Sequence, residues 1–251
     1  MAPLNLTMRL RLLLRSLLIQ GSWNYRTMQG AGLGFVLIPI LKRLYGTDRE
    51  ALHEALGRHV GFFNANPYMA TVAATALARM EGDGVTAEQV QRFKSALVSP
   101  LGSLGDRLIW ARWRPLCVLL AVLAFLAGVP WWGVCVFFLV LYNAVPMGLR
   151  VWGLRIGWRH GIDVGRTLMS SRLRRLPDRL TIPLAIVSGA VLPPLFLVFG
   201  GTSGVNPIPV IGVAVVLAAV GYYRPVAVRR IVTAGLIAAA VCVIGLELTI
   251  W

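Results

Sequence analysis

Two long stretches without a charged residue limit what this chain can fold into. Residues 116–149 and residues 180–223 contain no Asp, Glu, Lys or Arg. A helix that crosses a membrane needs about 20 consecutive apolar residues, so each stretch is long enough for two such helices. Charged residues make up only 14% of the 251-residue chain, against about 25% in soluble domains. The sequence therefore predicts an all-α integral membrane protein and excludes an ordinary soluble domain.

Loop residues divide the second half of the chain into about five predicted transmembrane helices. Pro130-Trp131-Trp132-Gly133 interrupts the first stretch, a glycine-rich loop at residues 200–207 interrupts the second, and residues 231–251 supply a fifth span. Arginines cluster in three segments outside these loops: residues 107–114, 150–179 and 224–230. Arginine-rich segments next to membrane spans face the cytoplasm. We therefore expect both interrupting loops and the C-terminus to be external.

The first 112 residues contain apolar stretches that are too short or too interrupted to cross a membrane simply. Residues 30–41 number only 12, residues 60–78 contain Asn64-Ala65-Asn66-Pro67, and residues 95–105 contain Pro100. Free backbone groups at membrane depth are tolerated only where protein or a water-filled cavity surrounds them. Such segments indicate the substrate site of a transporter, and we predict re-entrant hairpins here. The alternative is ordinary helices and turns on the membrane surface.

Two segments of this half are simpler. Residues 8–19 place Arg11 and Arg15 one turn apart beside leucines, which predicts an amphipathic helix on the cytoplasmic face. Residues 81–93 form a cytoplasmic connector, in which Thr86 and Gln89 make a capping box. The expected organisation is one functional unit in two parts. These are a substrate-site half at residues 1–112, and transmembrane hairpins at residues 113–251 with a basic cytoplasmic loop at about 150–179.

The charge balance and the cysteines narrow the classes of partner. The chain has 25 Lys and Arg against 10 Asp and Glu, a formal net charge of +15. In a soluble protein this would indicate nucleic acid, but here it fits cationic loops on anionic lipid, so no nucleic acid is expected. Cys117, Cys135 and Cys242 lie in apolar runs without a metal-ligand spacing. No phosphate-binding loop or dinucleotide fingerprint occurs, so we expect neither a metal nor a cofactor.

Polar residues that are neither caps nor cationic loops begin with Gln20-Gly21-Ser22-Trp23-Asn24-Tyr25. Amides bridge neighbouring hydroxyls of a sugar, and an aromatic face covers the C–H surface of the ring. Gln20, Trp23 and Asn24 are therefore candidate sugar-binding residues. The alternative is a membrane-interface anchor made by Trp23 and Tyr25.

A second polar group lies in the interrupted segment at residues 60–78. Asn64 and Asn66 can line a binding cavity at a hairpin tip, or can satisfy the backbone groups freed before Pro67. His59 suits a proton or phosphate relay. We favour a structural role for His59 because it follows Arg49, Glu50, His53, Glu54 and Arg58 on a predicted solvated helix.

Asp106 is the third candidate, at the mouth of a glycine-rich break. Acids inside membranes usually have a function, and this carboxylate can bind a sugar hydroxyl. Alternatively, Asp106 caps the next helix or pairs with Arg107. Asp163 is interpreted as an ion-pair partner among the arginines. Neither paired catalytic carboxylates nor a Ser/His/Asp arrangement is recognisable, so an intramembrane enzyme using Asp106 and His59 is the weakest hypothesis.

The same stretches resemble the IID membrane subunit of mannose-family phosphotransferase-system (PTS) sugar transporters. The resemblance runs from about residue 16 to residue 165. It rests on four motifs: Gln20-Gly21-Ser22-Trp23-Asn24-Tyr25 with Met28-Gln29-Gly30, Arg58-His59-Val60-Gly61-Phe62-Phe63-Asn64-Ala65-Asn66-Pro67, Gly102-Ser103-Leu104-Gly105-Asp106, and His160-Gly161-Ile162-Asp163. One departure is Arg107, where the family usually has proline after Gly-Asp.

This resemblance implies a subunit that pairs with a IIC partner in the bacterial inner membrane, in trimers of IIC–IID pairs, and moves a hexose inward. Soluble IIA and IIB proteins supply the phosphate, so the chain is not catalytic by itself. Gln20, Trp23, Asn24, Asn64, Asn66 and Asp106 are then expected along the sugar path. The alternative, suggested by Arg107, is a membrane scaffold for PTS regulation that no longer transports sugar.

Overall fold

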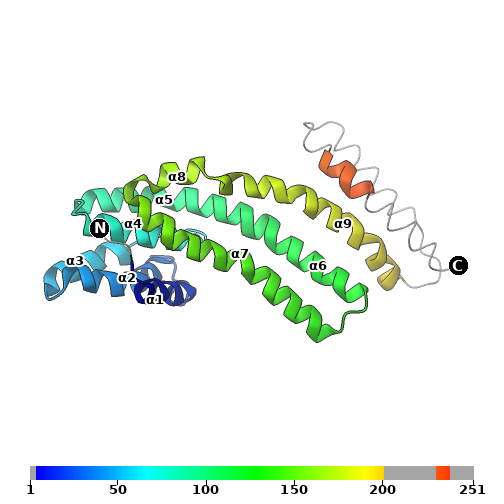
Figure 1. The fold of residues 1–251 in the computed structure, drawn as a ribbon, viewed down its shortest axis with the longest axis horizontal. Coiled ribbons are helices and arrows are strands. Elements are labelled where there is room, and N and C mark those ends of the chain that lie inside the picture. Colours follow the sequence, from blue (N-terminus) through cyan, green and yellow to red (C-terminus); the bar gives the residue numbers. More distant parts are fainter. Residues whose placement is uncertain (1–3, 201–229, 238–251) are drawn as a thin grey trace. The chain divides into compact units, whose positions relative to one another are not determined.

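The computed structural model describes residues 4–200 and 230–237, and within them the fold is helical (Figure 1). The helices are α1 Leu6–Leu17, α2 Gly30–Tyr45, α3 Arg49–Val60, α4 Ala70–Gly82, α5 Ala87–Gly105, α6 Arg114–Leu126, α7 Trp131–His160, α8 Val164–Ser170 and α9 Leu176–Gly200. A π-helix joins α5 to α6 at Asp106–Trp113, and short 3₁₀ turns flank α8. The predicted all-α class is confirmed for this part of the chain.

The chain divides into two compact units. The first unit contains residues 4–109 and 143–174, and the second contains residues 110–142 and the described residues from 175 onward. Two continuous helical runs, Ala87–Leu126 and Trp131–Leu192, are long and apolar enough to span a membrane. The predicted loop at residues 200–207, the second half of the 180–223 stretch and most of the fifth predicted span lie outside the described residues.

Helix α1 has the predicted amphipathic character. The Asn5 side chain caps its start by accepting a 2.9 Å hydrogen bond from the Met8 amide, which satisfies one of the free donors of the first turn. Met8, Leu12 and Ser16 follow one another at four-residue spacing and form its buried face. The opposite face remains exposed.

Of the three interruptions predicted in the first half, the structure contains one. Helix α3 ends at Val60 and α4 begins at Ala70, with non-helical backbone at Asn64–Pro67 between them. The expected break at Pro100 was wrong, because α5 continues through this proline, and the short stretch at residues 30–41 lies within α2, which continues through Pro39. A proline removes one helical hydrogen bond, and buried leucines and isoleucines around both prolines hold the helices in place by packing. Whether the segments are re-entrant in a membrane stays a prediction.

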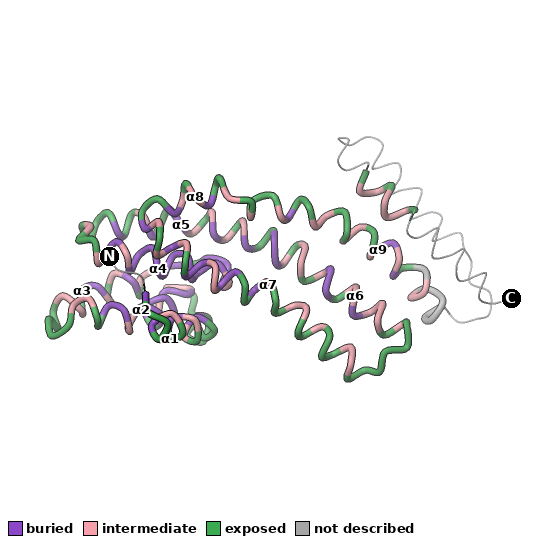
Figure 2. The backbone as a smooth tube through the Cα atoms, in the orientation of Figure 1, coloured by how far each residue is buried: buried purple, intermediate pink, exposed green. Residues whose placement is uncertain are grey.

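Helix α4 is the centre of the first unit, with nearly every residue buried (Figure 2). It packs on the C-terminal part of α7 through small residues. A Cβ added to Gly153 would lie 2.3 Å from Thr71 Oγ1, and one added to Gly157 would lie 2.3 Å from Thr75 Oγ1. The Thr71 hydroxyl donates a 3.0 Å hydrogen bond to the Arg150 carbonyl. Small residues at four-residue spacing let two backbones approach this closely in membrane proteins.

The second unit is built mainly from α6, α9 and the N-terminal part of α7. Helix α6 packs against α9, and Arg112 donates a 3.0 Å hydrogen bond to the Thr181 hydroxyl. The predicted turn at residues 130–133 lies slightly earlier, at residues 127–130, with Gly128 at φ 85. The basic loop predicted at residues 150–179 is instead largely helical, since α7 continues to His160 and α8 follows. Arginine has a high helix propensity, so its clustering did not indicate a loop.

Candidate functional site

Two segments that were interpreted separately from the sequence are paired in the first unit. Met28 forms isolated β-bridges with Asn24 and with Phe63. The Gln29 amide donates to the Phe63 carbonyl at 2.8 Å, and the Phe63 amide donates to the Thr27 carbonyl at 3.2 Å. Met28 has φ 53, a left-handed conformation that is uncommon for non-glycine residues and is concentrated at functional sites. The loop after α1 and the break between α3 and α4 therefore form one substructure.

The buried Gln29 side chain locks this pairing. Its Nε2 donates a 2.8 Å hydrogen bond to the Ala65 carbonyl, and its Oε1 accepts a 3.4 Å bond from the Ala65 amide. These bonds satisfy backbone groups that the helix break would otherwise leave free. Gln29 thus fixes the strand-like stretch on which Asn64 and Asn66 lie.

Asn66 and Asp106 are brought into contact across 40 residues of sequence. Asn66 is buried, and its Nδ2 donates a 2.9 Å hydrogen bond to Oδ1 of the exposed Asp106. Its Oδ1 accepts a 3.1 Å bond from the Tyr68 amide. A Cβ added to Gly105 would lie 2.3 Å from the Asn66 Cβ, so glycine is required there for this contact. Asp106 begins the π-helix, an irregularity that is frequent at functional sites.

The other predicted sugar-binding residues lie around this pair or before it. Asn64 is exposed, two residues from Asn66. Asn24 folds its own loop, because its Oδ1 accepts bonds from the Arg26 and Thr27 amides at 3.0 and 2.9 Å. Gln20 and Trp23 are exposed, and the Trp23 and Tyr25 rings meet edge to face at 4.8 Å between centroids. The structure joins Asn66 to Asp106 directly, and a sugar-binding role for the six residues stays a prediction.

A buried charge cluster, which the sequence interpretation missed, centres on Glu81. Arg58 Nη2 lies 2.9 Å from Glu81 Oε2, and His59 Nε2 lies 2.8 Å from Glu81 Oε1. The Tyr45 hydroxyl also donates to Glu81. We assigned Glu81 to a solvated connector and His59 to a solvated helix, and both assignments were wrong, since both side chains are buried. One feature of the sequence indicated a buried position for Glu81: it is the first acidic residue after the uncharged stretch at residues 60–78.

Lys94 on α5 completes this region. Its fully buried ammonium donates hydrogen bonds to the carbonyls of Arg58, Gly61 and His59 at 2.7, 3.2 and 3.4 Å. These carbonyls end α3, and a cation at a helix C-terminus is favoured by the helix dipole. Lys94 therefore anchors the start of the break that leads to Asn64 and Asn66.

The cluster shifts the pKa values of its members. Burial alone would raise the pKa of Glu81, but hydrogen bonds from His59, Arg58 and Tyr45 outweigh it and lower the pKa to about 2. Burial and the hydrogen bond to Glu81 raise the pKa of Tyr45 to about 12. Burial lowers the pKa of His59 in spite of Glu81. A neutral, fully buried imidazole is inaccessible to a soluble phosphate donor, which favours the structural role for His59.

Arg150 also departs from the sequence interpretation, which placed it in a solvated cationic segment. Its guanidinium is buried, with Nη1 donating to the carbonyls of Ser16 and Pro67 at 2.8 and 2.9 Å, and lies 5.1 Å from the centre of the Tyr68 ring. Arg150 thus ties the end of α1 and the break before α4 to α7.

Residues 4–200 and 230–237 contain no cluster of three or more His, Cys, Asp or Glu side chains suited to a metal.

The sequence of this chain is similar to those of a known protein family. Residues 4–198 match the model of the PTS system mannose/fructose/sorbose family IID component. The chain belongs to this family. It is 33% identical over 184 residues to the mannose-specific EIID component of Escherichia coli K12, covering 71% of this chain and 64% of the relative. It is 32% identical over 184 residues to the sorbose-specific EIID component of Klebsiella pneumoniae, covering 71% and 66%.

Solved structures agree with this assignment. One chain of a cryo-EM structure of the mannose transporter ManYZ in complex with microcin E492 superposes with a TM-score of 0.59 at 25% identity, over 88% of this chain and 97% of that chain. A second structure, described as a membrane protein, gives a TM-score of 0.67 at 26% identity over the same shares. The chain thus shares its fold with membrane proteins, one of them a chain of a mannose transporter. It spans 64% of the length of the Escherichia coli relative.

Proposed function

We propose that this IID component moves a hexose or a related sugar across the bacterial inner membrane together with a IIC partner. Soluble IIA and IIB proteins would supply the coupled phosphorylation, and IIC–IID pairs would assemble as trimers. The likeness to a chain of the mannose transporter ManYZ supports both the partner and the sugar. In this proposal the N-terminus is cytoplasmic, the C-terminus is external, and the chain acts as one functional unit.

The contact between Asn66 and Asp106 carries the proposal. A carboxylate beside an amide presents acceptors and donors at the spacing that neighbouring sugar hydroxyls need. Asp106 is exposed while its partner is buried and fixed, so the pair is preorganised for a ligand. Asn64 and Asn24 lie on the two backbone segments that pair beside it. Gln20 and Trp23 complete the proposed sugar path.

The test is phosphoenolpyruvate-dependent uptake of labelled sugar by cells that carry Asp106→Asn or Asn66→Ala. Each change removes a charge-assisted hydrogen bond, and we expect uptake at limiting sugar to fall about 10- to 100-fold. Asp163→Asn is the matched control, because Asp163 is exposed and forms only a 3.8 Å pair with Arg166. Membrane levels of each variant must equal the wild type. Normal uptake with both site variants would reject the site.

The scaffold alternative rests on Arg107, an exposed cation directly after Asp106. If the chain is a regulatory scaffold, wild-type cells take up no sugar through this system, yet the membrane complex still binds its soluble PTS proteins. Uptake that is lost on deleting the gene and restored by the wild-type chain excludes this alternative.

A further inference from the structure

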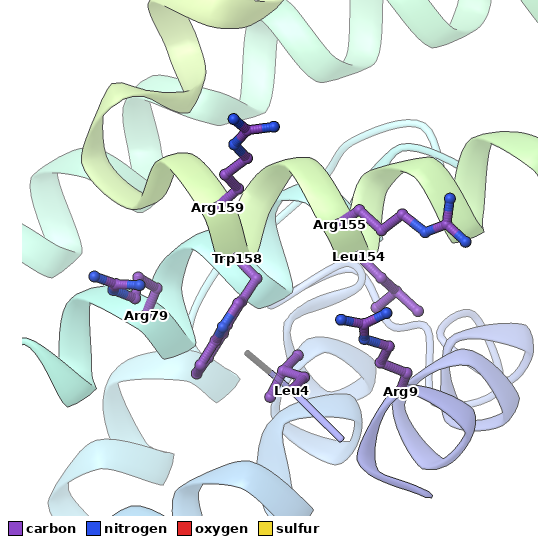
Figure 3. Close-up of a pocket in the computed structure, with 7 residues that line it drawn as sticks. All are labelled: Leu4, Arg9, Arg79, Leu154, Arg155, Trp158 and Arg159. Carbon is purple, nitrogen blue, oxygen red and sulfur yellow. The ribbon is translucent and has the colours of Figure 1, made fainter. Parts of the chain in front are cut away.

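A cationic pocket lies on the first unit, away from the Asn66 and Asp106 pair. Its volume is about 380 Å³. Figure 3 shows its lining, which comes from the N-terminal segment, α1, α4 and α7: Leu4, Arg9, Arg79, Leu154, Arg155, Trp158 and Arg159. Four of these seven residues are arginines and the other three are apolar.

The arginines of this pocket are largely uncompensated. Arg79 Nε pairs with Asp83 at 2.6 Å. Arg9, Arg155 and Arg159 form no ion pair with a carboxylate in the part of the chain that the structure describes. The side chains of Arg9 and Arg155 lie beside Leu154 in Figure 3, and a bound anion relieves the repulsion between such like charges. The planar guanidinium fork matches phosphate oxygens bidentately. The pocket therefore suits a phosphate group attached to an apolar body.

Helix α1 indicates where that phosphate comes from. Leu6, Leu10 and Leu14 are 71%, 48% and 62% exposed. At 100° per residue they form a stripe opposite the buried face of Met8 and Leu12. An amphipathic helix with such a stripe lies in the membrane interface with its leucines among the acyl chains. Arg9 flanks the stripe, which puts the pocket at the depth of the lipid headgroups.

We propose that this pocket binds the phosphate of an anionic phospholipid. The guanidinium groups of Arg9 and Arg155 hold the phosphate, because the Arg159 side chain points to the opposite side of α7 (Figure 3). Trp158 and Leu154 contact the glycerol region, and the acyl chains follow the leucine stripe of α1. Because the pocket joins α1 to α4 and α7, the bound lipid fixes the first unit at the membrane surface. Basic pockets between helices on the cytoplasmic side bind anionic headgroups in this way.

The test is lipid titration of the full-length chain, purified from membranes in detergent and analysed by native mass spectrometry. We expect phosphatidylglycerol to bind and phosphatidylcholine to bind much more weakly. The double variant Arg9→Gln, Arg155→Gln should weaken phosphatidylglycerol binding about 30-fold, since each basic residue near an anionic headgroup contributes about 5-fold. Arg166→Gln, a change at an exposed arginine on α8, should bind phosphatidylglycerol as the wild type does. Arg9→Lys with Arg155→Lys keeps the charge and loses the planar fork, so its affinity for phosphatidylglycerol should lie between those of the wild type and the glutamine double variant.

Four outcomes overturn the proposal. Equal binding of the two lipids, or equal loss in the Arg166 control, shows that no specific headgroup site exists. If millimolar inorganic phosphate displaces phosphatidylglycerol at an unchanged detergent concentration, and lipid affinity does not depend on the acyl chains, the pocket binds a free phosphate. If an acidic soluble PTS protein covers the pocket arginines, and the double variant leaves lipid binding unchanged, the pocket is a docking site for that protein.

Discussion

Residues 131–145 of α7 are uncharged and mostly apolar, and none of them is buried. Residues 146–160 of the same helix carry three arginines, and six of these residues are buried (Figure 2). Trp131 is 73% exposed and Val140 69%. Helix α4 is buried nearly all round although it is rich in alanine and threonine. In a membrane protein, lipid is as apolar as leucine, so apolar composition marks the surface that lipid covers. Small residues and internal hydrogen bonds mark the protein interior.

The largest expected effect tests the small-residue half of this comparison. A Cβ at Gly157 would lie 2.3 Å from both Thr75 Oγ1 and the Val72 carbonyl, and the backbone of α4 cannot move away without losing its packing. Gly157→Val should therefore destabilise the protein by about 5 kcal/mol or more. The measurement is the amount of folded protein in membranes, by detergent extraction and size-exclusion chromatography.

Gly148 on the same helix is the matched control. A Cβ added there would meet nothing within 4 Å, and an alanine is favoured over a glycine within a helix by about 0.5 to 1 kcal/mol. Gly148→Ala should fold as well as the wild type or better. Normal yield from Gly157→Val would show that α4 and α7 do not pack as described.

Glu81→Gln tests whether the polar interior is more costly to disturb than the apolar exterior. The change removes the negative charge that pairs with Arg58 and replaces one of the two acceptor oxygens by an NH₂ donor, and the loss of one partner of a buried ion pair costs about 3 to 5 kcal/mol. The readout is the unfolding temperature in one detergent. Glu88→Gln removes an exposed partner of Arg92 and should shift the unfolding temperature little.

The stability that the Glu81 cluster contributes depends on pH, and the direction of this dependence follows from the pKa of Glu81. The pKa of Glu81 is about 2 in the folded protein against an ordinary value of 4.5, so its stabilisation is complete above about pH 4.5 and is lost as the pH falls toward 2. The unfolding temperature should therefore decline through this window. In Glu81→Gln that part of the decline should be smaller, and an unchanged acid profile would remove Glu81 as its cause.

Arg150→Met is expected to have an intermediate effect. Methionine fills much of the volume, but the carbonyls of Ser16 and Pro67 lose their donor in a buried place, at about 1 to 3 kcal/mol for each group left unsatisfied. Arg166→Met, at an exposed position on α8, should change stability by less than about 0.5 kcal/mol. The unfolding temperatures of the two variants decide the point, and equal values would contradict the buried role of Arg150.

Local signals in the sequence predicted local structure. Asparagine and proline at residues 64–67 predicted the break before α4, and leucines spaced by turns predicted α1. Thr86 caps α5 as expected, accepting from the Gln89 amide. In each case the residues that determine the structure lie within a few positions of it, so the periodicity and capping rules apply.

The sequence did not indicate which residues far apart along the chain contact one another in the fold. Glu81 meets Tyr45 and Arg58, and Arg150 meets Ser16 and Pro67, across 23 to 134 residues. Charge alone made both Glu81 and Arg150 look solvated, because burial of a charge depends on such partners. Asp106 was chosen for its charge and position, while its contact with Asn66 became visible only in the fold. Pro100 failed as a break because packing on both sides of it overrides local preference.

The smallest expected effect isolates lipid from protein packing in the opening comparison. Val72 is fully buried on α4, whereas Val140 on α7 is exposed. Val72→Ala should lower stability by about 2 kcal/mol because it leaves a void, and Val140→Ala should change it by less than about 0.5 kcal/mol because lipid or detergent fills the space. Both changes gain the same helix propensity, so the difference between the two unfolding temperatures reports packing alone. An equal loss from Val140→Ala would mean that another protein surface, rather than lipid, covers residues 131–145, and the proposed IIC partner would then be the surface to test.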